Sequence, residues 1–478
     1  MNVKTISLLA IIATWGMNAH ASGAFGALDV LRAEQNISAT AAGSIVPVCE
    51  FDRAPSRPLP LAEAVERTLC NNPKTRAAWA AVKAQAAGVG VARAAYLPTI
   101  SANLQGVREN SVTNVDNHPM LSTDIASTVH AESVSLNWLL YDFGGREAAL
   151  KNANALLEAA RATQDATLQS FFAQTAKDYY ASKTAIGSLQ AAQDVELMTR
   201  QSMTAAQARA DKGVAPITDA LQAQTQHEQA VFSLTKAQSD AQTALGTLAA
   251  DMNLDPSMPL ELPAVTDNVQ TGKDFSEPVA AMIRDVQLSH PSVRAAQAQY
   301  EAAMAKVTQT RAQGLPSISL VAKYSRNNEP QSMGVGEPTF PSTGHDAYIG
   351  VQLSIPLFEG FGRHYQVDQA KAQAERQEYA LEDAKRQVGL DVWSSYQTLT
   401  GATQNAQNSA NLLAIAQRSW DAAKHRYDAG VGNILELMNT QAALANAKQR
   451  RVQALADWDN ARVDLAAKLG RLGRGDLE

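Results

Sequence analysis

The chain has 478 residues, of which 18% are charged and 6% are aromatic, and its formal net charge is −6. This Ala- and Gln-rich composition with few aromatic residues is typical of long helices packed through small side chains rather than of a globular enzyme. The sequence shows no basic patch or Lys/Arg stripe, which argues against nucleic acid as a partner.

The first residues predict an exported protein. Lys4 is a short basic region, residues 6–15 form a compact apolar stretch, and Ala-His-Ala at 19–21 fits a small-x-small cleavage site. We expect residues 1–21 to be a signal peptide, because the apolar stretch is shorter than the roughly 20 residues of a membrane-spanning helix. No cysteine stands directly after the cleavage site, which indicates no lipid anchor, and no later apolar run predicts a transmembrane helix.

Cys49 and Cys70 are the two cysteines of the chain. An oxidising periplasm would allow them to form a disulfide that closes a loop near the N-terminus, and two unpaired thiols are the alternative.

An internal duplication organises the rest of the sequence. Three blocks in the first half recur in the second half at a nearly constant offset of 217 or 218 residues, which predicts two copies of one unit. The blocks are Leu97–Ser101 with Leu315–Ser319, Leu140–Arg146 with Leu357–Arg363, and Arg209–Gln224 with Arg426–Gln441. The expected domains are a signal peptide (1–21), an N-terminal periplasmic extension (22–60), a first repeat (61–252), an equatorial linker (253–280), a second repeat (281–470) and a C-terminal tail (471–478).

Each repeat contains two segments in which apolar and polar residues alternate with period 2, as expected for β-strands. The segments are about 98–106 and 133–142 in the first repeat and about 316–325 and 346–357 in the second. Their lengths are close to the 9–11 residues that a tilted strand needs to cross an outer membrane. The polar segments 106–131 and 326–346 between them are expected to be exposed loops.

A small soluble sandwich is the alternative interpretation of these four strands. In a membrane every backbone polar group must be paired, so a sheet must close on itself, and four strands are too few to form a barrel. The membrane interpretation therefore predicts that several subunits contribute strands to one barrel.

Two long helices are predicted at about 145–210 and 362–428. Apolar residues seven positions apart, such as Val367, Ala374 and Leu381, indicate supercoiled helix packing. A cytosolic coiled coil is the alternative, but the signal peptide and the strands argue against it.

Both long helices end at a predicted helical hairpin tip, at 211–219 and 429–436. Gly213 and Gly430 are the expected C-cap glycines. Asn433 with Glu436 three residues later has the pattern of a capping box at the start of the returning helix.

The duplication, the Leu-Pro-x-Ile-Ser strand starts, the Gly-Arg junctions and the tip sequences together resemble the TolC family of outer-membrane efflux and secretion channels. The resemblance covers residues from about Leu61 to Leu469. It implies a protein that is mostly α with a membrane β-barrel, built from a duplicated protomer of four strands and long coiled-coil helices. Three protomers would then form a twelve-stranded barrel and a twelve-helix periplasmic tunnel.

The resemblance also implies where the tunnel closes. Thr218 and Asp219 match positions that bond to the second hairpin, and Tyr427 matches a gate tyrosine, although it also ends the heptad row of its helix. Glu436 matches an acidic constriction ring, where three copies would attract cations, and the alternative is that it only caps its helix.

Two tip positions depart from the family pattern. Gly432 stands where the family's model channel has a gate arginine, and Asn439 stands where it has a second ring aspartate. The closed state is therefore expected to lack those arginine links and to use other contacts.

These features predict a homotrimeric channel in a Gram-negative outer membrane, in contact with its lipid and extending into the periplasm. The resemblance implies a periplasmic adaptor and an inner-membrane ABC or RND-type transporter as partners. The missing lipid-anchor cysteine favours type I protein or toxin secretion over multidrug or small-molecule efflux. A structural periplasmic coiled-coil adaptor is the alternative from another class. The sequence contains no catalytic motif, metal cluster or phosphate-binding loop, so no enzyme, metal or cofactor is expected.

Overall fold

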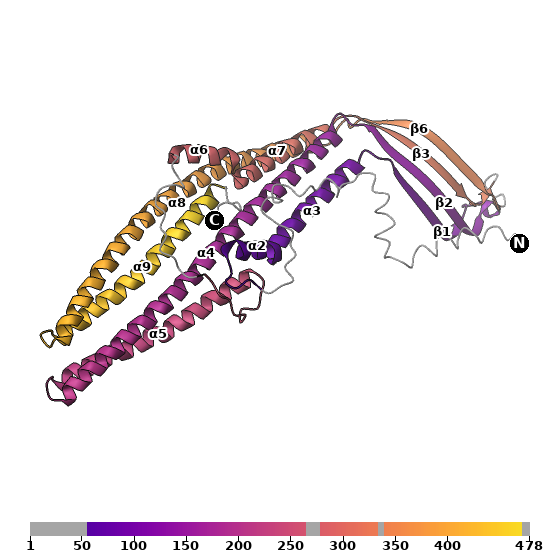
Figure 1. Cartoon of the computed structure of the whole chain (residues 1–478). Coiled ribbons are helices and arrows are strands. Elements are labelled where there is room, and N and C mark those ends of the chain that lie inside the picture. Colours follow the sequence, from indigo (N-terminus) through magenta and orange to yellow (C-terminus); the bar gives the residue numbers. More distant parts are fainter. Residues whose placement is uncertain (1–54, 264–277, 333–338, 471–478) are drawn as a thin grey trace. The chain divides into compact units, whose positions relative to one another are not determined.

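The computed structural model describes residues 55–263, 278–332 and 339–470 (Figure 1). The described chain divides into two compact units. The strand unit comprises residues 83–157 and 298–377, and the helical unit comprises most of the remainder. The predicted signal peptide, most of the predicted N-terminal extension with Cys49, half of the equatorial linker and the C-terminal tail lie outside the described residues. Cys70 is disulfide-bonded and buried in a helix, but its pairing with Cys49 stays a prediction.

The helices of the two repeats occur in the same order and have the same lengths. The first repeat has α2 (Leu61–Asn71), α3 (Pro73–Ala94), α4 (Gly145–Asp211) and α5 (Ile217–Asp251), and the second has α6 (Val279–Ser289), α7 (Pro291–Ala312), α8 (Gly362–Asp428) and α9 (Ile434–Lys468). Both long helices have 67 residues, and both returning helices have 35. The duplication therefore extends over whole helices, and the protein is mostly α as expected. Among the described helices, none has the length and apolar character that crossing a membrane requires.

Four antiparallel strands form the sheet of the strand unit in the order β1-β2-β3-β6 (Figure 1). The strands are β1 (Thr99–Thr113), β2 (Thr123–Tyr141), β3 (Ser317–Asn327) and β6 (Gly344–Ser354), and the two-residue strands β4 (Gln331–Ser332) and β5 (Thr339–Phe340) form a separate ladder. Within the described chain, β1 and β6 are edge strands with one unpaired side each. Such edges must find partners before a sheet can lie in lipid.

The strand register places the alternating apolar residues on one face of the sheet. Directly paired residues point to the same side, so one row contains Ile100, Leu136, Ala322 and Ile349. The remaining apolar positions of this face are Ala102, Leu104, Val112, Ala126, Val134, Trp138, Ile318, Leu320, Tyr324, Ala347, Val351 and Leu353. Large members of this set are exposed, with Ile349 at 75%. An exposed apolar face of this extent is suited to contact with lipid.

The opposite face of the sheet is mostly polar and uncharged, although Val107, Val129 and Val321 lie on it, as does Glu109. Its rows contain Thr99, Ser101, Asn103, Ser133, Ser135, Asn137, Ser319, Lys323, Ser325, Asp346, Tyr348 and Gln352. The hydroxyls of Ser101 and Ser135 lie 2.8 Å apart, within hydrogen-bond distance. Hydroxyl and amide groups make this face suitable for contact with water.

The first hairpin is longer than the sequence indicated. Residues 106–131 were expected to be a loop, but β1 and β2 pair from Thr99↔Asn137 as far as Thr113↔Thr123. This expectation was wrong because both faces of the outer part of the hairpin carry polar residues, which hides the period-2 signal. Eight consecutive pairs, from Gly106↔His130 onward, extend the ladder by about 26 Å at 3.3 Å per residue.

The Gly-Arg motif fastens the end of a strand to the start of a long helix. The guanidinium of Arg146 donates hydrogen bonds to the carbonyls of Leu139 (2.6 Å) and Leu140 (2.9 Å), and it stacks on the ring of Tyr96 at 4.7 Å. The Asp142 carboxylate accepts a hydrogen bond from the Arg146 backbone N–H at 2.7 Å. One arginine thus satisfies the carbonyls that are left free where β2 ends and α4 begins.

We expect Arg146→Ala to lower the free energy of unfolding of the strand unit by about 2–4 kcal/mol. The Leu139 and Leu140 carbonyls would lose their charged hydrogen-bond donor, and the Tyr96 ring would lose its cation–π contact. The measurement is the temperature at which the purified oligomer dissociates. Arg363→Ala is the matched control, since the repeat-related Arg363 contacts side chains such as Glu359 and Gln313. Equal losses in the two variants would contradict this role of Arg146.

Burial at the end of α5 affects one carboxyl group of the helical unit. Asp251 follows the core residues Leu248 and Ala249, and its Oδ2 atom is buried without a hydrogen-bond donor. Burial, followed by the neighbouring carboxyl of Asp178, raises the pKa of Asp251 to about 7, and Lys74 opposes the shift. The folded protein therefore holds a proton that the unfolded chain releases near pH 4.

This proton makes the stability of the helical unit depend on pH. The raised pKa of Asp251 makes a contribution to the free energy of unfolding that is fully present below pH 3.8. This contribution is lost as the pH rises to about 7. In Asp251→Asn the midpoint temperature of thermal unfolding should depend less on pH over this range, and at pH 8 it should be higher than in the wild type. Asp240→Asn, at an exposed position of the same helix, should leave the profile unchanged. If the unfolding temperature of Asp251→Asn depends on pH as steeply as that of the wild type, Asp251 is not the group responsible.

Candidate functional site

The two hairpin tips lie in the helical unit and have the same turn geometry. Gly213 and Gly430 adopt φ values of 71° and 78°, a left-handed conformation that glycine adopts without strain. The N–H of Val214 bonds to the Arg209 carbonyl and that of Gly213 to the Ala210 carbonyl, which together form a Schellman cap. The same two bonds recur at Gly430 and its following residue. Both glycines therefore end their helices as the sequence predicted.

Gly432 is glycine for a steric reason. A Cβ atom built at this position would lie 2.6 Å from the Tyr427 nitrogen and 2.8 Å from the Arg426 carbonyl carbon. Both obstacles are backbone atoms of the last turn of α8, so they cannot rotate away. The N–H of Gly432 also donates to the Arg426 carbonyl at 2.9 Å. This tip turn has no space for any side chain, including the arginine of the family's model channel.

Tyr427 lies in a small apolar cluster between the hairpins. The cluster contains Ala206 of α4 and Ala223 of α5 together with Ile434 and Leu437 of α9, and Tyr427 is 5% exposed. Burial raises the pKa of the Tyr427 phenol, and the Arg209 cation opposes this shift. The phenol therefore stays neutral at physiological pH and presents an uncharged ring.

Arg209 connects the first hairpin to the second. Its guanidinium lies over the Tyr427 ring, 4.2 Å from the centroid, and donates a hydrogen bond to the Tyr427 carbonyl at 2.6 Å. One side chain of α4 thus makes a cation–π contact and a charged hydrogen bond to the end of α8. Arg209 thus links the two hairpins at the tips, where Gly432 leaves no room for an arginine.

The repeat-related arginine has a different partner. Arg426 corresponds to Arg209, and it lies 3.7 Å from Glu436 within its own hairpin. Glu436 in turn corresponds to Asp219, but no ion pair joins Arg209 to Asp219 among the described residues. The repeat position that corresponds to Tyr427 is Ala210, which has no aromatic ring. Arg426 therefore finds no ring in the first hairpin like the one that Arg209 finds in the second.

The structure places the other predicted site residues at the tips with fewer contacts. Thr218 is exposed and Asp219 is half-buried in the first turn of α5, and within the described ranges neither bonds to the second hairpin. Asp219 is close enough to Tyr427 to raise the pKa of its phenol. The Asn433 side chain caps α9 by accepting from the Leu435 N–H at 2.9 Å. Glu436 pairs with Arg426, so only the Asn433 half of the expected capping box is observed.

Arg209 is the site residue that the sequence did not single out. Its recurrence as Arg426 was visible, but a repeated arginine is compatible with an exposed helix face. Its role depends on Tyr427, whose place beside α4 becomes visible only in three dimensions.

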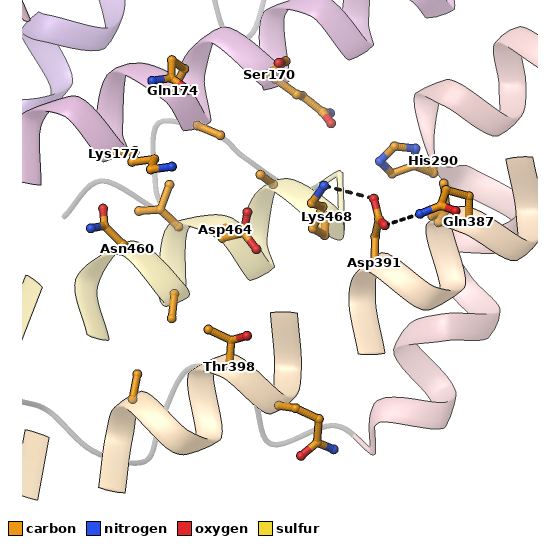
Figure 2. A pocket seen from close by; sticks show the side chains of 18 of the residues that line it. Ser170, Gln174, Lys177, His290, Gln387, Asp391, Thr398, Asn460, Asp464 and Lys468 are labelled. Atoms are coloured by element: carbon orange, nitrogen blue, oxygen red, sulfur yellow. Dashed lines mark hydrogen bonds and ion pairs between the residues drawn. The ribbon is translucent and has the colours of Figure 1, made fainter. Parts of the chain in front are cut away.

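A polar cavity of about 940 Å³ lies elsewhere in the helical unit, where α9 ends beside the start of α7. Figure 2 shows Lys468 and Gln387 on either side of Asp391, with contacts of 3.0 Å and 2.7 Å. Burial and the nearby Lys468 cation lower the pKa of His290. The charges of Lys468 and Asp391 neutralise each other, so this ion pair supports a junction between helices.

The fold and the tips together define a duplicated protomer with an exposed apolar sheet face and paired helical hairpins. The family model described as "Outer membrane efflux protein" matches residues 64–253 and 282–471. The chain belongs to this family. It is an outer-membrane export channel protein that extends into the periplasm, and the family consists of channels rather than enzymes.

Individual relatives match over most of their length. Protein CyaE of Bordetella pertussis is 31% identical over 420 residues, covering 88% of this chain and 86% of that protein. Alkaline protease secretion protein AprF of Pseudomonas aeruginosa is 25% identical over 435 residues, covering 88% and 86%. The structure of the Campylobacter jejuni CmeC outer membrane channel superposes with a TM-score of 0.75 at 16% identity, covering 87% and 86%, which shows a shared fold.

Proposed function

We propose that three copies of this chain form a closed twelve-stranded barrel and a twelve-helix tunnel that exports protein by type I secretion. The open edges of β1 and β6 support this assembly, because pairing β1 of one subunit with β6 of the next removes every unpaired edge. The apolar face of the sheet would then meet lipid, and the polar face would line the lumen. The channel would work with a periplasmic adaptor and an inner-membrane transporter that supplies the energy.

The lumen-facing surface supports a polypeptide as cargo. Glu109, Lys323 and Asp346 are the charged residues of the polar face, and most of its other residues carry hydroxyl or amide groups. A surface of nearly neutral polar groups has little preference for the charge of a passing chain and offers few strong binding points. The similarity to AprF, whose name describes protease secretion, supports the same cargo class.

The contact of Arg209 with Tyr427 is our candidate for the link that keeps the tunnel closed. It joins the hairpin of the first repeat to that of the second through one buried tyrosine and one arginine. Opening would require the two hairpins to separate and this contact to break. Glu436, paired with Arg426, would add a partly neutralised acidic ring at the constriction.

The cargo is tested by comparing the secreted proteins of a strain that lacks this chain with those of its parent. We expect one or a few large secreted proteins to disappear and to return on complementation. A second measurement, the susceptibility of both strains to drugs and detergents, tests small-molecule efflux. An unchanged secreted profile with increased susceptibility would replace protein secretion by efflux. No change in either measurement would contradict an export role.

A further inference from the structure

The lipid-facing side of the sheet carries a cluster of cationic and imidazole side chains just beyond its apolar rows. One row further from the long helices than Tyr324, this face carries Glu132, Arg326 and His345, which are paired across β2, β3 and β6. The following rows add His130 and then Arg108. We call Arg108, His130, Arg326 and His345 the outer belt. All four are exposed, and the helices α3 and α4 join the opposite end of the strands.

Local contacts hold parts of the belt in place. The Asn328 side chain donates to the Thr128 carbonyl at 3.2 Å, and the Asn328 backbone N–H donates to the His130 carbonyl at 3.2 Å. Gly106 is directly paired with His130 across the two strands, and a Cβ at Gly106 would be in ordinary van der Waals contact with the His130 ring, 3.5 Å from Nδ1. The rings of His345 and Tyr324 lie 6.4 Å apart.

The charges at the two ends of the sheet are balanced differently. At the helix end, Arg146 lies 3.6 Å from Asp142 and Arg363 lies 3.0 Å from Glu359. At the hairpin end, neither Arg108 nor Arg326 has a carboxylate within ion-pair distance in the part of the chain that the structure describes. Glu132 is paired in register with Arg326 but lies beyond this distance. The belt therefore presents two arginines without an ion-pair contact among the described residues where the apolar face meets water.

We propose that the outer belt binds the phosphate groups of lipids in the outer leaflet of the membrane. The apolar rows fix the depth of the sheet in the hydrocarbon, so the belt falls at headgroup level. Arg326 and His345 are directly paired across neighbouring strands, at a spacing that allows both to contact one phosphate. Arginine suits this role because its planar guanidinium binds phosphate through two parallel hydrogen bonds. A phosphorylated glycolipid is the occupant that matches this charge and this depth.

The test is a titration of the purified, delipidated full-length oligomer with diphosphoryl lipid A in detergent, read out by native mass spectrometry. We expect saturable binding that weakens at high salt, as expected for partly exposed charges. The double variant Arg108→Gln/Arg326→Gln should bind at least about tenfold more weakly, which corresponds to the loss of one charged hydrogen bond. Arg326→Lys keeps the charge but loses the two parallel hydrogen bonds, so its affinity should lie between those of the wild type and the double variant.

Lys323→Gln is the matched control, because it removes a cation from β3 on the opposite face of the sheet. It should bind like the wild type. Equal affinity in the wild type and the double variant would overturn the proposal, and so would equal binding of dephosphorylated lipid A. Displacement of the lipid by inorganic phosphate at low millimolar concentration would indicate a free-anion site instead and would also contradict it.

Discussion

Arg209→Ala should produce a leaky outer membrane. The substitution removes the cation–π contact with Tyr427 and the hydrogen bond to its carbonyl, which together contribute about 2–4 kcal/mol per subunit. A loss of about 2 kcal/mol at one link raises the open population about thirtyfold. Cells that produce the variant should become sensitive to a large antibiotic that an intact outer membrane excludes. The minimum concentration that inhibits growth is the measurement.

Arg426→Ala is the matched control for this prediction. It removes the repeat-related arginine from the same turn of the other long helix, but the contact that it breaks lies within one hairpin. Its effect on antibiotic sensitivity should be clearly smaller. If Arg426→Ala leaks as much as Arg209→Ala, or if neither variant leaks, the link between the hairpins does not hold the channel closed.

Gly432→Ala should disrupt the second hairpin tip. The added methyl group would meet backbone atoms of Arg426 and Tyr427 at 2.6–3.0 Å, so the turn must move. Overpacking of this kind costs about 1–3 kcal/mol, and about 1 kcal/mol increases local opening roughly fivefold. Trypsin should therefore cleave after Lys424 and Arg426 at least about fivefold faster in the variant.

Gly401→Ala is the control, because Gly401 lies inside α8 with open space around its Cα. Alanine in a helix interior is favourable by about 0.5–1 kcal/mol relative to glycine, so this variant should be cleaved no faster than the wild type. A wild-type cleavage rate in Gly432→Ala would show that the turn accommodates a side chain.

Patterns that depend on local chemistry could be predicted from the sequence. The alternation around Ile100 and Ile349, the heptads of α8 and the glycines at 213 and 430 reflect the geometry of a strand, a supercoil and a helix end. Each of these signals depends on residues close together along the chain. The recurrence of three blocks at one offset then linked the local signals into a duplicated protomer.

Features that depend on residues far apart in the sequence could not be predicted. Arg209 and Tyr427 are 218 positions apart, and Arg209 resembles its repeat partner Arg426 until the packing distinguishes them. At Gly432 the sequence indicates only that an arginine is missing, whereas the structure shows a turn that has no room for one. The outer part of the β1–β2 hairpin was missed because polar residues on both faces carry no alternation.

The most direct test of an export channel is electrical. Purified full-length protein should insert into a planar lipid bilayer and give discrete current steps of low conductance, because we propose that the contact between Arg209 and Tyr427 closes the tips. Under the same conditions the Arg209→Ala protein should give larger steps or a higher open fraction. A correctly assembled oligomer that inserts but passes no current, in the wild type and the variant alike, would contradict a channel.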